Sequence, residues 1–408
     1  MGRKLGEKIR KEFPIFHNNP DLVFLDSAAS TQKPRAVIDA VSECYDRYYA
    51  NVHRGIYSLS ERSSEAYEAV REKVRSFINA GSVREVIFTR NATESINLVA
   101  YSWGRHTLQK GDEILITIME HHANMVPWQE LARERGAVLK YAPITPEGRI
   151  DLRAFARLLS EKTKLVAFTH MSNVLGTINP VTEMVRMIRK HTGAVILVDG
   201  AQSVPHFPVD VQALGVDFYA FSSHKMLGPS GVGVLFGKQE LLESMPPFLT
   251  GGDMISRVRI GGAEWNELPW KFEAGTPSIA DVIGFGAAID FLQSIGMGNV
   301  FQHELELTAE ALDVLKKIGG ISIVGPGEAK ERGSAIAFTV ADVHPHDLAS
   351  IFDEEGVAVR AGNHCTQPLH EHIGIPATAR ASFYLYNTSQ DIHALVDAIN
   401  KVKKTFRV

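Results

Sequence analysis

The chain has 408 residues, of which 45% are hydrophobic, and a formal net charge of −4 at pH 7. This length and apolar content predict a large buried core divided between two domains. The near-neutral balance argues against nucleic-acid or anionic-membrane partners, and no apolar run approaches the length of a membrane span. Cys44 and Cys365 are the only cysteines, and charged residues follow Met1. We therefore expect no disulfide framework, no signal peptide and a reducing, cytoplasmic compartment.

Apolar runs typical of buried strands alternate with amphipathic stretches typical of helices over the first part of the chain. Strands are predicted near residues 23–25, 85–89, 113–117, 139–143, 164–169, 194–198, 218–221 and 232–236. Helices are predicted near residues 34–49, 61–79, 151–160 and 181–191, with Cys44 as a core thiol inside the first. This alternation predicts an α/β fold with a mostly parallel sheet covered on both faces.

Small and polar residues follow several of these strands, where open α/β sheets bind ligands. Residues 26–30 are small enough for a ligand to approach the backbone closely, although a plain turn has the same composition. Residues 90–95 open a helix with hydroxyl side chains, which suits a phosphate group as well as an ordinary N-cap. His121 and His122 are adjacent and have no third metal ligand nearby, so a stacking imidazole is favoured over a zinc site.

A carboxylate and a lysine follow two consecutive buried strands. Asp199 comes directly after the strand 194–198, and Lys225 comes shortly after the strand 218–221. If the two strands are parallel, their carboxyl ends meet at one edge of the sheet. Pyridoxal phosphate (PLP) requires such a pair, because the lysine forms its Schiff base and the carboxylate pairs with its pyridinium nitrogen. Together the two residues predict a PLP site.

The rest of the chain changes character. Residues 245–275 look irregular and are rich in glycine, proline and tryptophan. Beyond a helix near 281–296, a smaller α+β pattern is predicted, with helices at 299–317, 346–355 and 389–406 and strands at 321–324, 335–339, 357–360 and 381–386. We predict a segment 1–20 that packs on the small domain, a large PLP-binding domain at 21–280, and a small C-terminal domain at 281–408.

The small domain has a polar loop that contains a cysteine. Cys365 follows a predicted strand and stands close to Arg360 and His364, which favours thiolate character, although a lone loop cysteine is also compatible with an inert free thiol. His370 and His372 follow in the sequence, but a single nearby cysteine argues against a metal site.

At this point the sequence resembles a known family. The matching stretches are Leu25-Asp26-Ser27-Ala28-Ala29-Ser30, Val52-His53-Arg54-Gly55, Met119-Glu120-His121-His122-Ala123-Asn124, Ser172-Asn173-Val174-Leu175-Gly176-Thr177, Val198-Asp199-Gly200-Ala201-Gln202, Ser223-His224-Lys225, Phe272-Glu273-Ala274-Gly275-Thr276-Pro277 and Arg360-Ala361-Gly362-Asn363-His364-Cys365. They resemble the class V enzymes of PLP fold type I, and specifically the SufS-type, or group II, cysteine desulfurases. The resemblance extends from about residue 10 to the C-terminus and implies a seven-stranded sheet between helices.

The resemblance implies a role for each matching residue. Lys225 would hold PLP as a Schiff base, Asp199 would pair with the ring nitrogen, His122 would stack on the ring and Gln202 would bond the ring hydroxyl. The remaining cofactor-binding residues would be Ala92, Thr93, Ser222 and His224, with Thr276 reaching the phosphate from the other subunit of a homodimer. The substrate would meet Arg380, Asn173, Ala28, Ala29 and Arg360, with His53 and Arg54 at the cysteine-loop end. Thr366 departs from the alanine usual in this group.

The implied reaction converts L-cysteine to L-alanine and leaves the sulfur on Cys365 as a persulfide. Lys225, Cys365 and His122 would be the catalytic residues. A small sulfur acceptor, SufE- or SufU-like, and an iron–sulfur scaffold are the implied partners. A selenocysteine lyase acting on L-selenocysteine, a cysteine-sulfinate desulfinase and a transaminase of the same fold remain as alternatives.

Overall fold

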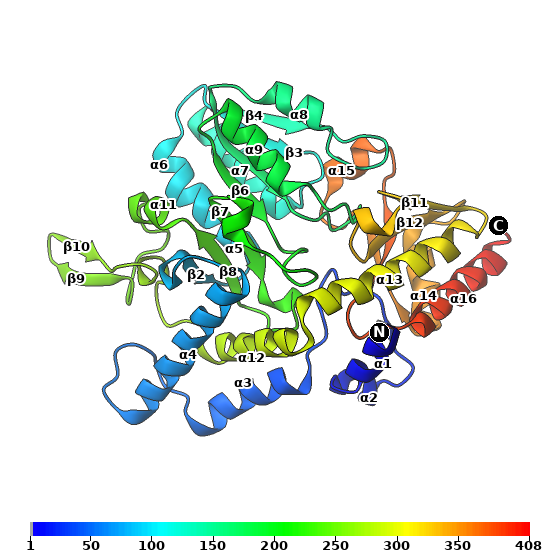
Figure 1. The fold of residues 1–408 in the computed structure, drawn as a ribbon, viewed down its shortest axis with the longest axis horizontal. Helices are drawn as coiled ribbons and strands as arrows, with labels where there is room; N and C mark the ends of the chain where they lie inside the picture. Colours follow the sequence, from blue (N-terminus) through cyan, green and yellow to red (C-terminus); the bar gives the residue numbers. More distant parts are fainter. Residues whose placement is uncertain (1–2) are drawn as a thin grey trace.

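A seven-stranded sheet forms the centre of the computed structural model, which describes residues 3–408 (Figure 1). Its strands follow the order β2-β8-β7-β6-β5-β3-β4. They span Val86–Thr89 (β2), Gly233–Gly237 (β8), Phe218–Ser222 (β7), Val195–Asp199 (β6), Thr163–Thr169 (β5), Glu113–Thr117 (β3) and Val138–Ala142 (β4). Only β8 runs antiparallel, to both of its neighbours. The predicted mostly parallel sheet of seven strands is confirmed.

Helices cover both faces of this sheet. The α-helices of the part of the chain that contains this sheet are α3 (Arg35–Arg47), α4 (Ser58–Phe77), α5 (Ala92–Leu98), α6 (Arg105–Thr107), α7 (Val126–Arg135), α8 (Leu152–Leu158), α9 (Val181–His191), α10 (Val211–Leu214), α11 (Gln239–Ser244) and α12 (Ile279–Ile295). A turn of π-helix, η2 (Val99–Gly104), continues α5. Two apolar clusters, one per face, include residues of α4, α9 and α12 on one side and of α5 and α7 on the other.

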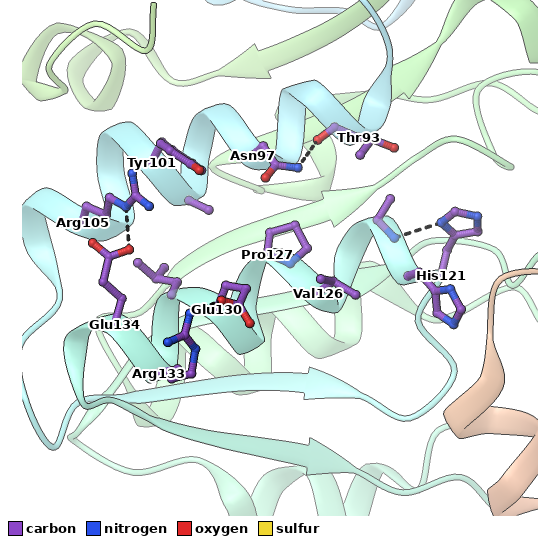
Figure 2. Close-up of a pocket in the computed structure, with 14 residues that line it drawn as sticks. Thr93, Asn97, Tyr101, Arg105, His121, Val126, Pro127, Glu130, Arg133 and Glu134 are labelled. Atoms are coloured by element: carbon purple, nitrogen blue, oxygen red, sulfur yellow. Dashed lines mark hydrogen bonds and ion pairs between the residues drawn. The ribbon is translucent and has the colours of Figure 1, made fainter.

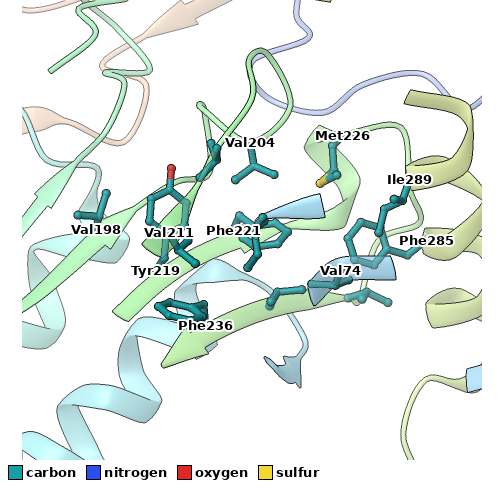
Figure 3. Close-up of a cluster of buried hydrophobic side chains, with 14 of the residues drawn as sticks. Val74, Val198, Val204, Val211, Tyr219, Phe221, Met226, Phe236, Phe285 and Ile289 are labelled. Atoms are coloured by element: carbon teal, nitrogen blue, oxygen red, sulfur yellow. The ribbon is translucent and has the colours of Figure 1, made fainter. Parts of the chain in front are cut away.

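Alternation along the strands explains this two-faced packing. In β7, Phe218 and Ala220 join the cluster on the α5 and α7 side, whereas Tyr219 and Phe221 join the cluster on the opposite side. Figure 3 shows Tyr219 and Phe221 in the same cluster as Phe285 from α12. Burying one such aromatic side chain contributes about 1.5–3 kcal/mol, so the strand ends that hold polar residues rest on a firmly packed core.

The helix α12 packs against α3 and α4, and α13 (Met297–Lys316) follows it after a bend of 74°. Gly296 stands at the break with φ of 85°, a left-handed conformation that favours glycine. Among residues 3–408 no single helix is long and apolar enough to cross a membrane, and only the bent pair α12 and α13 meets that requirement by length and composition.

A second, antiparallel sheet has the order β11-β12-β15-β14. Its strands span Ile321–Val324 (β11), Ala335–Val340 (β12), Thr378–Ser382 (β15) and Arg360–Gly362 (β14), and its helices are α13, α14 (Pro345–Glu354), α15 (Gln367–His372) and α16 (Ser389–Phe406). The strand predicted at 381–386 is wrong in its bounds. Residues 383–386 are buried without joining the sheet, and the hydroxyl of Tyr384, for example, donates to the Pro205 carbonyl at 2.9 Å.

The N-terminal helices α1 (Arg3–Arg10) and α2 (Pro14–Asn18) lie beside the small sheet (Figure 1). The ring of Phe13 meets that of Tyr386 edge-on, with centroids 4.9 Å apart. The short strands β1 (Val23–Phe24) and β13 (Val357–Ala358) pair in parallel. The two domains are thus bridged near both ends of the chain.

A hairpin projects from the large domain where the sequence looked irregular (Figure 1). Its strands are β9 (Ile255–Arg259) and β10 (Gly262–Trp265). The expectation of irregular structure is wrong for these residues. Neither face of the hairpin is buried, and Val258 and Ile260 are exposed. Because a strand shows alternating apolar and polar residues only when one face is buried, the sequence had no such pattern here.

Candidate active site

A cavity of about 270 Å³ lies where the carboxyl ends of the central strands meet the small domain. Twelve of the predicted residues line it, namely Ala28, Ala29, Ala92, Thr93, Asn173, Asp199, Gln202, Ser222, His224, Lys225, Arg360 and Arg380. They come from seven separate stretches of the sequence, which the topology gathers at one sheet edge. His121, Thr169 and His364 also line the cavity.

Lys225 and Asp199 form the floor of the cavity. Asp199 ends β6, Lys225 ends the short helix η4 (Ser223–Lys225) after β7, and the two strands pair in parallel. Burial lowers the pKa of Lys225 to about 8, against the opposing effect of Asp199. Burial raises the pKa of Asp199, while the Ala201 N–H and the Lys225 charge lower it. A lysine with this pKa supplies neutral amine near pH 8, as Schiff-base formation requires.

The opposite end of the cavity is closed by the start of α5. The Ala92 N–H donates to the Ser222 hydroxyl at 2.8 Å. The helix approaches β8 this closely because residue 233 is glycine, and a Cβ there would lie 2.4 Å from the Asn91 Cα. Burial and the charges of Lys225 and Lys33 lower the pKa of His224 to about 4. Neutral donors and hydroxyl groups at a helix start suit a phosphate.

Arg380 is the buried cation of the cavity. Its guanidinium donates to the Asn173 carbonyl at 3.1 Å and to Asp26 Oδ1 at 2.8 Å, and its Nε has no hydrogen-bond partner among the described residues. Burial lowers the Arg380 pKa and Asp26 raises it. Gln202 donates to the Ala28 carbonyl at 2.7 Å and so fixes the loop opposite. An arginine fixed on two sides with a free N–H is suited to hold a carboxylate.

The structure places His121, and not the predicted His122, beside the cavity. His121 lines the cavity, and its Nδ1 accepts the Ala123 N–H at 3.0 Å. Burial, with the charge of Lys225 next in size, lowers the His121 pKa to about 3, so this imidazole is neutral. His121 has extended backbone whereas His122 begins the short helix η3 (His122–Asn124), and the centroids of their two rings lie 6.3 Å apart. The prediction for His122 is wrong in its placement.

His122 instead contacts the cysteine loop, residues 363–366. Its N–H donates to the Cys365 carbonyl at 2.8 Å, and its Nε2 accepts the Gln367 N–H at 3.1 Å. From the large domain, the Asn173 side chain also donates to the His364 carbonyl at 2.9 Å. The large domain thus holds the backbone of the loop and of the residue after it at three positions, 364, 365 and 367, which the sequence did not indicate.

Cys365 stands at the edge of the cavity rather than in its lining. Its Sγ lies 3.7 Å from an Arg360 Nη, and Arg360 does line the cavity. His364 and Cys365 have φ of 52° and 61°, two consecutive left-handed residues that are not glycine. Such backbone is uncommon and persists only where surrounding contacts enforce it.

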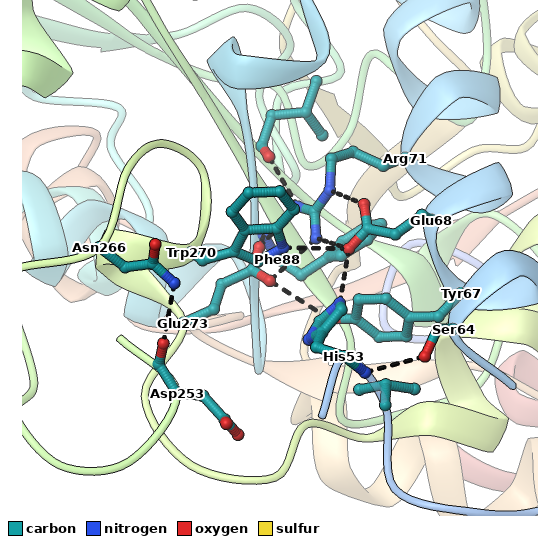
Figure 4. Close-up of polar contacts among 12 residues, drawn as sticks. His53, Ser64, Tyr67, Glu68, Arg71, Phe88, Asp253, Asn266, Trp270 and Glu273 are labelled. Carbon is teal, nitrogen blue, oxygen red and sulfur yellow. Dashed lines mark hydrogen bonds and ion pairs between the residues drawn. The ribbon is translucent and has the colours of Figure 1, made fainter. Parts of the chain in front are cut away.

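His53, Arg54 and Thr276 do not reach the cavity of their own chain. His53 Nε2 donates to the Glu68 carboxylate at 2.8 Å, beside the buried Arg71 (Figure 4). Arg54 pairs with Asp253, and Thr276 lines a separate depression on the surface. The expectation that His53 and Arg54 lie at the cysteine-loop end is wrong within one chain, because α4 and the loop before α12 hold them elsewhere.

An open groove of about 490 Å³ adjoins the cavity and shares Thr93, His121 and Ala123 with it (Figure 2). It runs outward between η2 and α7, where the Arg105 guanidinium lies over the Tyr101 ring at 3.6 Å and pairs with Glu134. The described residues contain no cluster of three or more His, Cys, Asp or Glu side chains suited to a metal ion.

Sequence reasoning missed Glu120, a fully buried acid beneath His121. Its carboxylate accepts from Thr117 Oγ1 at 2.5 Å, Asn124 Nδ2 at 2.6 Å and the Thr169 N–H at 3.1 Å. Burial raises the Glu120 pKa to about 8 although these donors lower it. A charged residue immediately after a buried strand was the available signal.

The residues of the cavity fit PLP. A buried lysine of lowered pKa, a buried carboxylate 26 positions before it (225 − 199), a neutral imidazole and a helix start with hydroxyl groups occur together at one sheet edge. This donor set, on a mostly parallel sheet with a small C-terminal domain, defines a PLP enzyme of fold type I.

The chain belongs to the Aminotransferase class-V family, which matches residues 23–395, and PLP is its cofactor. It is 52% identical to a probable cysteine desulfurase of Halalkalibacterium halodurans over 98% of both chains. The structure is similar to the cysteine desulfurase CsdA of Escherichia coli (TM-score 0.91, 40% identity) and to a cysteine desulfurase of Thermococcus onnurineus (TM-score 0.93, 37% identity), each over 98% of both chains. The class V resemblance is thereby confirmed.

Proposed function

We infer that this chain is a cysteine desulfurase that converts L-cysteine to L-alanine and transfers the sulfur to Cys365. One observation supports this most strongly. A loop held from both domains presents the Cys365 thiol beside Arg360, at the edge of a cavity that contains Lys225 and Arg380. A transaminase of the same fold has no need of a thiol in that position.

The residues divide the work between two ends of the cavity. PLP, when bound, withdraws electrons from the substrate and so weakens its Cα–H and C–S bonds. Arg380, fixed by Asp26 and the Asn173 carbonyl, lines the cavity and binds the substrate carboxylate there. Lys225 takes the α-proton as a positioned amine with a pKa of about 8. Neutral His121, which lines the cavity, would hold the ring of the cofactor.

Cys365 accepts the sulfur. Its thiolate attacks the substrate sulfur, an S–S bond forms, and the C–S bond breaks with its electron pair going to carbon. That carbon takes up a proton and becomes the methyl group of alanine, while Cys365 keeps a persulfide. Formation of the S–S bond removes two electrons from the two sulfurs, and the carbon takes up these two electrons, so no outside oxidant is needed.

We further propose SufS-type chemistry, in which a small SufE- or SufU-like acceptor removes the persulfide for iron–sulfur cluster assembly. Support comes from the half-buried position of Cys365 at the edge of the cavity, which leaves a route for a second nucleophile. Both cysteines are free thiols, in keeping with a reducing, cytoplasmic compartment.

We propose a homodimer because three residues of the family pattern do not line the cavity of their own chain. Thr276, His53 and Arg54 belong to the family pattern and yet lie on a face that also exposes Ile56 and Tyr57. A second copy facing these loops would bring them to the partner's cavity and cover the apolar side chains. Sedimentation equilibrium of the PLP-loaded protein tests this, and a monomer at micromolar concentration would refute it.

The direct test of function supplies L-cysteine and a reductant to the PLP-loaded protein and quantifies alanine and sulfide. The Cys365→Ala variant is measured beside it. Equal yields of alanine and sulfide that disappear in the variant support the desulfurase. Alanine that persists in the variant supports a selenocysteine lyase or cysteine-sulfinate desulfinase instead, an alternative favoured by the absence of Cys365 from the cavity lining.

A further inference from the structure

Thr366 departs from the alanine usual after the cysteine in the group that the sequence resembles, and it is fully buried. Its hydroxyl lies 2.7 Å from the Asn363 carbonyl and 3.2 Å from the His370 Nδ1. The Asn363 carbonyl also accepts the Thr366 N–H at 2.9 Å, and the Asn363 side chain accepts the Cys365 N–H at 3.1 Å. The turn that carries the thiol is closed by these contacts.

The same hydroxyl belongs to a chain of buried polar groups behind the loop. His370 Nε2 lies 3.3 Å and His364 Nε2 lies 3.0 Å from the Thr378 hydroxyl. Burial lowers the pKa of both His364 and His370, so each ring carries a single N–H. One direction of donation then runs through the network, which we assign as His364 to Thr378, Thr378 to His370, His370 to Thr366 and Thr366 to the Asn363 carbonyl, and it leaves the buried His364 Nδ1 without a hydrogen-bond partner among the described residues.

This assignment gives the loop residue a specific part in the network. The series of hydrogen bonds reaches the Asn363 carbonyl only if residue 366 has a hydroxyl group. With alanine or valine at this position, the His370 Nδ1–H would have only the backbone carbonyl of residue 366 as acceptor, at 3.2 Å. The two left-handed residues between Asn363 and Thr366 need such enforcement, because their backbone is otherwise unfavourable.

We propose that Thr366 is a positioning residue for Cys365, and that its hydroxyl, between the Asn363 carbonyl and His370, holds the thiol at the edge of the cavity. The proposal rests on the proposed desulfurase function, in which Cys365 must meet the substrate sulfur. Without the hydroxyl the loop opens more often, the thiol becomes more accessible to reagents, and it meets the substrate in the right orientation less often.

The test compares Thr366→Val with Thr366→Ser, which keeps the hydroxyl. Iodoacetamide labelling of Cys365, followed by peptide mass analysis, is expected to be about fivefold faster in Thr366→Val, the factor that corresponds to one hydrogen bond. Its kcat for alanine formation is expected to fall about tenfold at unchanged KM and unchanged PLP absorbance. Thr366→Ser is expected to restore both rates.

Thr308→Val provides the matched control, because Thr308 is also a buried threonine and its hydroxyl has no hydrogen-bond partner among the described residues. It is expected to change neither rate. If Thr366→Val does not fold, Thr366→Ala is compared with Thr366→Ser in its place. Labelling at the wild-type rate in the variant without the hydroxyl overturns the proposal. The labelling result stands even if the wild type yields no alanine, an outcome that would refute the proposed function alone.

Discussion

The floor of the cavity and the cysteine loop are held in different ways. Lys225 and Asp199 extend directly from parallel strands whose side chains are buried on both faces. Cys365 stands on left-handed backbone, where its carbonyl accepts the His122 N–H and its own N–H donates to the Asn363 side chain. Core packing fixes the floor, whereas a few polar contacts fix the loop. This difference suits the proposed chemistry, in which the lysine acts at one place and the cysteine meets both a substrate and an acceptor.

Removal of the lysine from the floor is expected to have the largest effect. Lys225→Ala should lower alanine formation on the order of 10³-fold, since a positioned acid–base group and the covalent attachment of PLP are lost together. The PLP absorbance of the purified protein should shift as well. Lys271→Ala is the control, because Lys271 is a buried lysine that donates to the Leu242 carbonyl far from the cavity. Normal PLP absorbance in Lys225→Ala would contradict the assignment.

Substitutions of the two adjacent histidines should distinguish effects on the floor of the cavity from effects on the cysteine loop. His121→Gln should change the PLP absorbance and lower alanine formation about 10²-fold, because His121 lines the cavity. His122→Ala should leave the absorbance unchanged and instead speed the labelling of Cys365, since the acceptor of the Gln367 N–H is lost. The reverse pattern would restore the original placement of His122.

The pH dependence of cofactor uptake addresses the floor alone. Because burial lowers the pKa of Lys225 to about 8, the neutral amine becomes the major form as the pH rises through that value. Uptake of PLP by the apoprotein should therefore accelerate between pH 7 and pH 9 and level off above. A rate that is flat across this range would argue against a lysine of lowered pKa.

The smallest effect is expected far from both regions. Burial raises the pKa of Glu68, but hydrogen bonds from His53 and Arg71 outweigh it and lower the pKa to about 2 (Figure 4). Glu68 thus stabilises the fold above its ordinary pKa of 4.5, and this contribution is lost as the pH falls from there through about 2.

Glu68→Gln should accordingly lower the free energy of unfolding at pH 7 by about 1–2 kcal/mol, measured by urea denaturation, with alanine formation per folded protomer intact. The exposed Glu72, paired with Arg75, serves as the control, and Glu72→Gln should change stability by less than about 0.5 kcal/mol. Equal losses for the two variants would show that the network around Arg71 has no special weight.

The same contrast explains what the sequence could predict. The floor was predictable because Asp199 and Lys225 follow strands, and strand direction places their ends together. The pairing of His122 with the cysteine loop was not, since residues 122 and 365 are brought together only by the docking of two domains. Which of His121 and His122 lines the cavity is decided by the change from extended to helical backbone between these two residues, and the sequence does not reveal this change. The exposed hairpin β9 and β10 left no apolar pattern to detect.

The central claim is that sulfur leaves the substrate on Cys365, and intact mass analysis tests it most directly. The PLP-loaded protein would be mixed with one equivalent of L-cysteine without reductant, quenched, alkylated and mapped by peptide. The account predicts one additional sulfur on the peptide containing Cys365, none on that containing Cys44, and one alanine per sulfur bound. Alanine formed with no sulfur on Cys365 would contradict it.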